Sequence, residues 1–134
     1  MAQWKAPRNV PRCRGNSPEI IEYATRIALS PEDKFERLRI GILNALEGVD
    51  WPMASVLLHF GHKDPYPIID YRALWSLGLD LKPLYYKFDF WWSYVECCRD
   101  LRAKAGTTMR ILDRALWQYS KEHQKAMRPF DAQL

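Results

Sequence analysis

The sequence has few cysteines and no long uncharged apolar run. Its three cysteines are Cys13, Cys97 and Cys98, an odd number that suggests no disulfide framework and includes no C-x-x-C pair for a zinc or iron–sulfur site. The most apolar stretch, residues 51–60, is about half the length that a membrane-spanning helix needs. We therefore expect no metal, no cofactor and no membrane span.

Acidic residues are missing from the start of the chain, and so is the apolar core of a signal peptide. The chain carries a net charge of +4, and its first fourteen residues hold four cations, Lys5, Arg8, Arg12 and Arg14. We expect residues 1–16 to form a basic, flexible, proline-containing arm that contacts the phosphate backbone of DNA. A solvated tail with no partner is the alternative. Without a signal region, the expected location is the cytoplasm, in soluble or nucleoid-associated form.

Alternation of apolar and polar residues, the pattern of β-strands, is absent at any useful length, and helical spacing dominates. Ser17-Pro18-Glu19 and Ser30-Pro31-Glu32 are typical helix starts. The sequence predicts an all-α domain over residues 17–134, with about six helices near 18–29, 31–46, 51–60, 71–77, 87–105 and 109–122. The apolar faces are expected at Phe35, Leu38, Ile42, Ala45 and Leu46, at Trp91, Tyr94, Val95, Cys98 and Leu101, and at Ile111, Leu112, Ala115, Leu116 and Tyr119.

The segment from Leu46 to Gly78 is predicted to be a hairpin between two helices, followed by a single carboxylate. Gly48 stands where the first helix ends, and Asp50 is a plausible N-cap of the second. Asp70 follows Pro52 by 18 residues and precedes the short predicted helix at 71–77. A carboxylate at that place is favoured by the unpaired N–H groups of the helix N-terminus.

This layout resembles the helix-hairpin-helix (HhH-GPD) DNA glycosylase superfamily. The hairpin of that superfamily reads L-P-G-V-G and is followed by a helix containing alanine and then by an aspartate after valine or isoleucine. The residues that match are Leu46, Gly48, Val49, Ala54, Ile69 and Asp70. Glu47, Asp50 and Pro52 depart from the pattern.

The resemblance implies a helix-hairpin-helix fold in which Asp70 is the catalytic carboxylate and the backbone of Gly48 and Val49 binds a DNA phosphate. Members that also cleave the strand carry a lysine where this chain has Pro52, so the resemblance implies release of the base without lyase chemistry. Glu47 and Asp50 place negative charge at the hairpin, which should weaken phosphate binding there.

Other candidates for the site rest on residue chemistry. Lys63 and Arg72 are expected to meet DNA phosphates. Rings that could stack on an extruded base are Trp51, Tyr66, Tyr71 and Trp75, although core packing explains any one of them as well. His59, His62 and Asp64 have the spacing of metal ligands, but a buried His59 bonded to backbone and an exposed His62 is the better interpretation.

Two functions follow, and whether the chain is an enzyme stays open. The first is a monofunctional DNA glycosylase-like protein of base excision repair that hydrolyses the N-glycosidic bond of a damaged or modified base. The second is a catalytically inactive scaffold of the same kind that binds DNA or protein, or forms homo-oligomers, through the aromatic-rich region 84–94. A third interpretation is a generic helical protein whose hairpin matches by chance.

Overall fold

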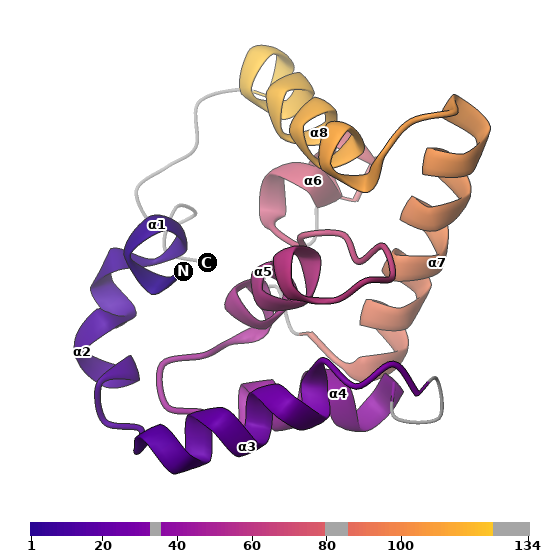
Figure 1. The fold of residues 1–134 in the computed structure, drawn as a ribbon. Helices are drawn as coiled ribbons and strands as arrows, with labels where there is room; N and C mark the ends of the chain where they lie inside the picture. The colour runs from indigo at the N-terminus through magenta and orange to yellow at the C-terminus, as the bar shows by residue number, and fades with distance from the viewer. Residues whose placement is uncertain (33–35, 80–85, 125–134) are drawn as a thin grey trace. The chain divides into compact units, whose positions relative to one another are not determined.

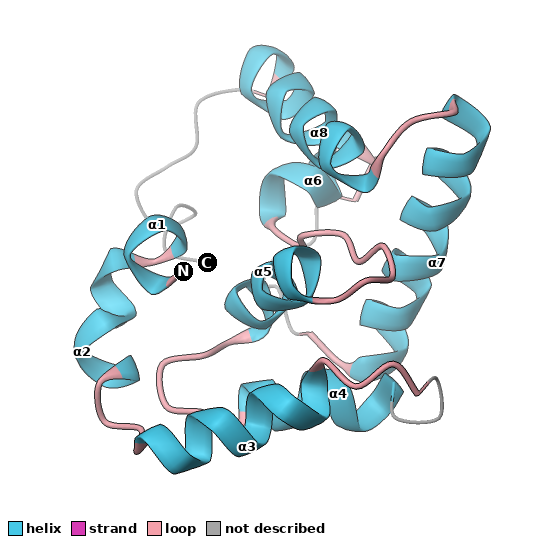
Figure 2. Cartoon of the chain, viewed as in Figure 1, coloured by secondary structure: helices cyan, strands magenta, loops and turns pink. Residues whose placement is uncertain are grey.

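Every regular element in the part of the chain that the computed structural model describes, residues 1–32, 36–79 and 86–124, is a helix (Figure 2). The predicted all-α class is therefore confirmed. The chain divides into two compact units, Met1–Tyr66 and Pro67–Leu134. The first contains α1 (Ala2–Lys5), the 3-10 helix η1 (Pro7–Asn9), α2 (Val10–Cys13), α3 (Pro18–Ala28), α4 (Glu36–Asn44) and α5 (Trp51–Gly61); the second contains α6 (Tyr71–Ser76), α7 (Phe88–Ala105) and α8 (Met109–His123) (Figure 1).

Side-chain caps fix the starts of four helices. Ser17, Asp50, Asp70 and Thr108 each accept a hydrogen bond from the backbone N–H three residues later, at 3.3, 3.1, 2.8 and 3.2 Å respectively. Each bond satisfies one of the donors that a helix N-terminus leaves without an intrahelical partner. The helix starts predicted at Ser17 and Asp50 are therefore confirmed, and Asp70 is a helix cap.

The N-terminal segment contains short helices that the sequence did not predict. α1, η1 and α2 cover most of residues 2–13, the part of the chain expected to be an arm. The ring of Trp4 lies edge-on to that of Phe60 on α5, with centroids 6.1 Å apart. The segment therefore contacts the rest of the first unit, while the division of domains at residue 16 stays a prediction.

A buried arginine organises the core of the first unit. Arg39 on α4 is 0% exposed. Its Nη1 donates to the backbone carbonyl of Ala28 at 2.8 Å and to that of Ser30, and its Nη2 donates to the carbonyl of Glu32 at 3.0 Å. These carbonyls belong to the last residue of α3 and to the chain that leaves it, so the guanidinium ties the end of α3 to α4.

Three further side chains complete this cluster. The Glu36 carboxylate lies 3.5 Å from Arg39 Nε and accepts hydrogen bonds at 2.7 and 2.6 Å from the hydroxyl of buried Tyr66. His62 is buried as well, with Nε2 3.0 Å from the carbonyl oxygen of Ser30. The prediction of an exposed His62 is wrong, because Ser30 and the Tyr66 ring enclose it. His59, with Nδ1 2.7 Å from the carbonyl oxygen of Tyr66, is bonded to backbone as expected.

The buried side of α4 differs from the predicted apolar face. Leu38 and Ala45 are exposed, whereas Arg39, Ile40, Leu43 and Leu46 are buried. Because the Arg39 guanidinium binds the carbonyls at the end of α3, α4 is oriented with Arg39 toward the core and Leu38 toward the outside. Phe35, which was expected on the same face, lies outside the described residues.

In the second unit the long helix α7 buries four of the five residues predicted for its apolar face, and the fifth, Leu101, is half-buried. Trp91, Tyr94, Val95 and Cys98 are all buried. The face predicted for α8 is wrong in part, because Ile111 and Tyr119 are exposed. α8 instead packs on α6, where the Ser76 hydroxyl donates to the carbonyl of Leu116.

Replacing Arg39 with methionine should destabilise the protein by about 3 kcal/mol or more. Methionine fills a similar volume but leaves three backbone carbonyls without their donor and the Glu36 carboxylate without its ion-pair partner. Urea unfolding at neutral pH measures the change. Arg37→Met, an exposed position on the same helix, is the control and should cost much less. Equal losses for the two variants would refute the role assigned to the buried guanidinium.

Candidate functional site

The turn of the predicted hairpin is covered by the N-terminal segment. Gly48 is buried with φ of 77°, a backbone conformation that favours glycine. Its carbonyl accepts a hydrogen bond from Asn9 Nδ2 at 3.2 Å, and Cys13 Sγ lies 3.7 Å away. Because η1 and α2 approach this closely, no side chain larger than hydrogen fits at position 48.

Asn16 binds both backbone groups of Glu47, the residue before Gly48. Its Oδ1 accepts from the backbone N–H of Glu47 at 2.8 Å, and its Nδ2 donates to the Glu47 carbonyl at 2.9 Å. The Glu47 carboxylate forms an exposed ion pair with Arg12 at 3.8 Å. The N-terminal segment therefore binds the Glu47 backbone and the Gly48 carbonyl, beside the Gly48 and Val49 backbone for which the resemblance implied a phosphate contact. The Val49 N–H donates to the Leu46 carbonyl at 3.2 Å.

A polar hollow of about 200 Å³ lies beside this turn. Arg12 lines it together with two carboxylates, those of Glu47 and Asp50, so an anion there would meet charge of both signs. Asp50 Oδ1 accepts from the Met53 N–H and caps α5. The remaining lining residues are Asn9, Asn44, Ala45, Leu46, Gly48 and Val49.

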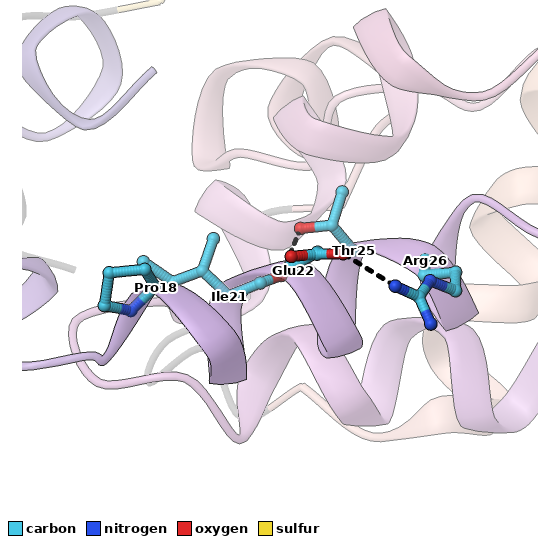
Figure 3. Close-up of a pocket in the computed structure, with 5 residues that line it drawn as sticks. All are labelled: Pro18, Ile21, Glu22, Thr25 and Arg26. Atoms are coloured by element: carbon cyan, nitrogen blue, oxygen red, sulfur yellow. Dashed lines mark hydrogen bonds and ion pairs between the residues drawn. The ribbon is translucent and has the colours of Figure 1, made fainter.

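A second hollow lies along α3 and is shown in Figure 3. It is lined by Pro18, Ile21, Glu22, Thr25 and Arg26, all from the same helix. Glu22 and Arg26 form an ion pair at 2.7 Å, and the Thr25 hydroxyl donates to the Ile21 carbonyl. The two charged groups satisfy each other along one helix, so no polar groups from different elements converge here as they do in a typical ligand site.

Asp70 caps its own helix, and α7 binds the chain just before it. Its Oδ1 accepts from the Ala73 N–H at 2.8 Å, and the side chain is half-buried. The preceding Ile69 is fully buried, and the carbonyl of Ile68 accepts a hydrogen bond from the Tyr94 hydroxyl at 2.7 Å. The carboxylate therefore sits on a fixed backbone at the positive end of α6.

Tyr94 of α7, which lies near Asp70, is buried. Burial raises the pKa of Tyr94 well above its usual value, and the neighbouring Cys98 and Asp70 add to the rise. Burial also raises the pKa of Cys98 to about 12, so this thiol stays protonated at neutral pH and is a poor nucleophile. Asp70, which lies near Tyr94, is half-buried and caps α6.

Arg72, two residues after Asp70, lies against two aromatic rings. Its Cζ is 5.4 Å from the centroid of Tyr71 and 5.3 Å from that of Trp117 on α8, and its Nη1 is 3.4 Å from Ser120 Oγ. Sequence reasoning missed Trp117. Trp117 and Lys121 stand four residues apart on one helix, and this spacing is the signal that could have found the Lys121–Trp117 contact, though not the contact with Arg72.

The other predicted site residues fall into two groups. In the first unit, Lys63, Arg8, Arg12 and Arg14 are exposed, Lys5, Val49 and Trp51 are half-buried, and Tyr66 is buried with its hydroxyl on Glu36. In the second unit, Tyr71, Arg72 and Trp75 are half-buried and share α6 with the Asp70 cap. The contacts of Tyr66 are those of a core residue rather than of a ring that receives a base.

The described residues hold no cluster of three or more histidine, cysteine or acidic side chains able to ligate a metal ion. Within the same ranges, no helix combines the length and the apolar character needed to cross a membrane. Of the aromatic-rich region 84–94, Leu84 and Tyr85 lie outside the described residues. Phe88 and Trp92 stack on each other along α7, with centroids 6.1 Å apart.

All regular elements in the described part of the chain are helices. Comparison of the chain with protein-family models, with curated proteins and with solved structures finds no match in any of the three.

Gly48→Ala should undock the N-terminal segment. An added Cβ would lie 2.8 Å from Cys13 Sγ and 2.9 Å from the Cys13 backbone nitrogen. Gly78→Ala is a matched control, because Gly78 also has a positive φ of 84° but has nothing within 4 Å of an added Cβ. The control should cost about 1–2 kcal/mol from backbone strain, and Gly48→Ala about 1–3 kcal/mol more from the clash.

Urea unfolding measures both losses, and limited proteolysis reports whether residues 1–16 become easier to cleave. Equal unfolding free energies and equal cleavage in the two variants would show that the contact of Gly48 with Cys13 is not important.

Proposed function

We propose that this protein is a monofunctional DNA glycosylase-like hydrolase that releases a damaged or modified base from DNA, with Asp70 as its catalytic carboxylate. The observation that carries the proposal is the setting of Asp70. The carboxylate is half-buried, is fixed at the N-terminus of α6 and follows a fully buried isoleucine. The resemblance of residues 46–78 to the glycosylase hairpin and its aspartate supplies the reaction.

In this reaction the bond between C1′ of the sugar and the nitrogen of the base breaks, and a bond between C1′ and a water oxygen forms. Positive charge develops on the sugar as the base leaves with the bonding electron pair. A carboxylate in a partly dry site stabilises that charge strongly and directs the water. One water proton passes to the carboxylate and then to solvent, and the departing base takes up a proton.

Strand cleavage is not part of the proposal. Pro52 stands in the first turn of α5 where strand-cleaving members of the superfamily carry a lysine, and proline has no amine with which to form a Schiff base. The product is therefore an intact strand with an abasic site.

In this proposal the phosphates of DNA are bound by side chains of the N-terminal segment rather than by the hairpin turn. Asn9 and Asn16 already bind the backbone of Gly48 and Glu47. Arg8, Arg12 and Arg14 are exposed on the segment that covers the turn. Guanidinium groups bind phosphates without reading sequence, which suits an enzyme that searches for rare bases.

Asp70→Asn should abolish base release and leave the fold intact. Asparagine caps a helix about as well as aspartate, so the loss isolates the charge. A panel of oligonucleotides with damaged or modified bases, followed by cleavage of abasic sites with hot alkali, measures release. Asp50→Asn makes the same change at the cap of α5 and should keep both fold and activity. Release by Asp70→Asn at the wild-type rate would refute the catalytic role.

Neutralising the N-terminal cations should reduce the salt dependence of DNA binding. Glutamine at positions 8, 12 and 14 removes charge but keeps Asn9 and Asn16, which hold the segment on the turn. The slope of log affinity against log salt should fall by about 0.9 for each arginine that contacts a phosphate. Fluorescence anisotropy with a labelled duplex over a range of KCl concentrations measures it. An unchanged slope would remove the segment from the DNA interface.

A non-catalytic binding module is the second candidate, and the covered turn favours it. A hairpin whose backbone groups are bound by the chain itself resembles an internal protein contact more than an open phosphate site. Under this function Asp70 is only a helix cap, no base is released from any oligonucleotide, and Asp70→Asn matches wild type in every binding measurement.

A further inference from the structure

One side of α3 is apolar and open to solvent. Ile20 and Tyr23 are 58% and 62% exposed, and Ile27, one turn further along, is half-buried. Side chains spaced three and four residues apart share one face of a helix, so these three form a single stripe, the α3 stripe. The side of α3 that packs inward carries Ala24 and Ala28 instead. An apolar stripe left open beside a packed face is typical of a surface that binds protein.

Two opposite charges border the α3 stripe. Glu19 and Arg26 stand seven residues apart, which is two helical turns, so they lie on the same edge of the stripe, the acid near one end and the cation near the other. Arg26 also pairs with Glu22 at 2.7 Å, but the side chains of that pair are 70% and 72% exposed. A guanidinium has five N–H donors, so Arg26 can bind a second carboxylate as well.

We propose that the α3 stripe is an interface between two copies of this chain, with their α3 helices packed antiparallel. A two-fold axis brings the same surface of each copy together, so each open stripe covers the other. The antiparallel direction places Glu19 of one copy beside Arg26 of the other, and the same ion pair forms again across the axis. In a parallel pair, each Glu19 would lie level with the other Glu19, and the charges would not match.

The interface is small. α3 has eleven residues, and one short helix on each side covers less area than the interface of a permanent dimer. We therefore expect a reversible dimer that forms at protein concentrations on the order of 100 µM. The inference does not depend on the reaction proposed for Asp70, which belongs to the second unit.

Sedimentation equilibrium of the full chain, at concentrations from roughly 5 to 500 µM, tests the interface. The average mass of wild type should rise from 15.8 kDa toward twice that value. Tyr23→Ala removes the central ring of the stripe and should raise the dissociation constant by about tenfold or more. Tyr119→Ala removes a ring of the second unit that is 51% exposed, and this control should dimerise as wild type does.

Charge reversal tests the antiparallel direction. Glu19→Arg and Arg26→Glu each bring like charges together at both ends of the interface, so each should weaken the dimer by about tenfold. The double variant restores opposite charges and should dimerise within about threefold of wild type. Circular dichroism verifies that all the variants are folded.

A wild type that stays monomeric at the highest concentration would overturn the inference, and the α3 stripe would then fit a different protein. A dimer that Tyr23→Ala leaves intact, or that Tyr119→Ala weakens equally, would also overturn it, because the contact would lie elsewhere. Failure of the double reversal to recover the affinity lost in the single variants would rule out the antiparallel pairing. Recovery, together with loss in Tyr23→Ala, would support the interface whether or not any base is released.

Discussion

The first unit depends on one buried guanidinium. Arg39 lies on α4 with no exposed surface and supplies donors to three carbonyls at and after the end of α3. An uncompensated charge in that position would be very costly, so the Glu36 carboxylate is required as its partner. The Tyr66 hydroxyl donates to that carboxylate and holds it in place. The contact of α3 with α4 and the burial of His62 follow from this arrangement.

In the same unit, the N-terminal segment binds the turn at Glu47 and Gly48. Glycine at position 48 is needed both for its positive φ and for the close approach of Cys13. Asn9 and Asn16 satisfy backbone groups that a turn of this kind would otherwise present to solvent or to a ligand.

Local signals predicted most of the secondary structure, while the orientation of individual side chains was harder to predict. The caps at Ser17 and Asp50 act within three residues, and sequence is enough to see them. Leu38 and Ile111 were expected to be buried and are exposed, because periodicity gives an apolar stripe without saying which neighbours meet it. The Arg72 contact with Trp117 joins residues far apart in the chain, so no local pattern reveals it.

The sequence by itself determined the helical class, the helix starts at Ser17 and Asp50 and the place of Asp70 at a helix N-terminus, since these depend on periodicity, capping and breakers along a short stretch of chain. The helix predicted over 31–46 is shorter in the structure, at Glu36–Asn44. Only the tertiary structure decided that an arginine would occupy the core, that the N-terminal segment would cover the turn at Glu47 and Gly48, and that cations would gather at Trp117. Each of these brings together groups from separate helices, and the free energy of such contacts depends on packing that the linear order does not encode.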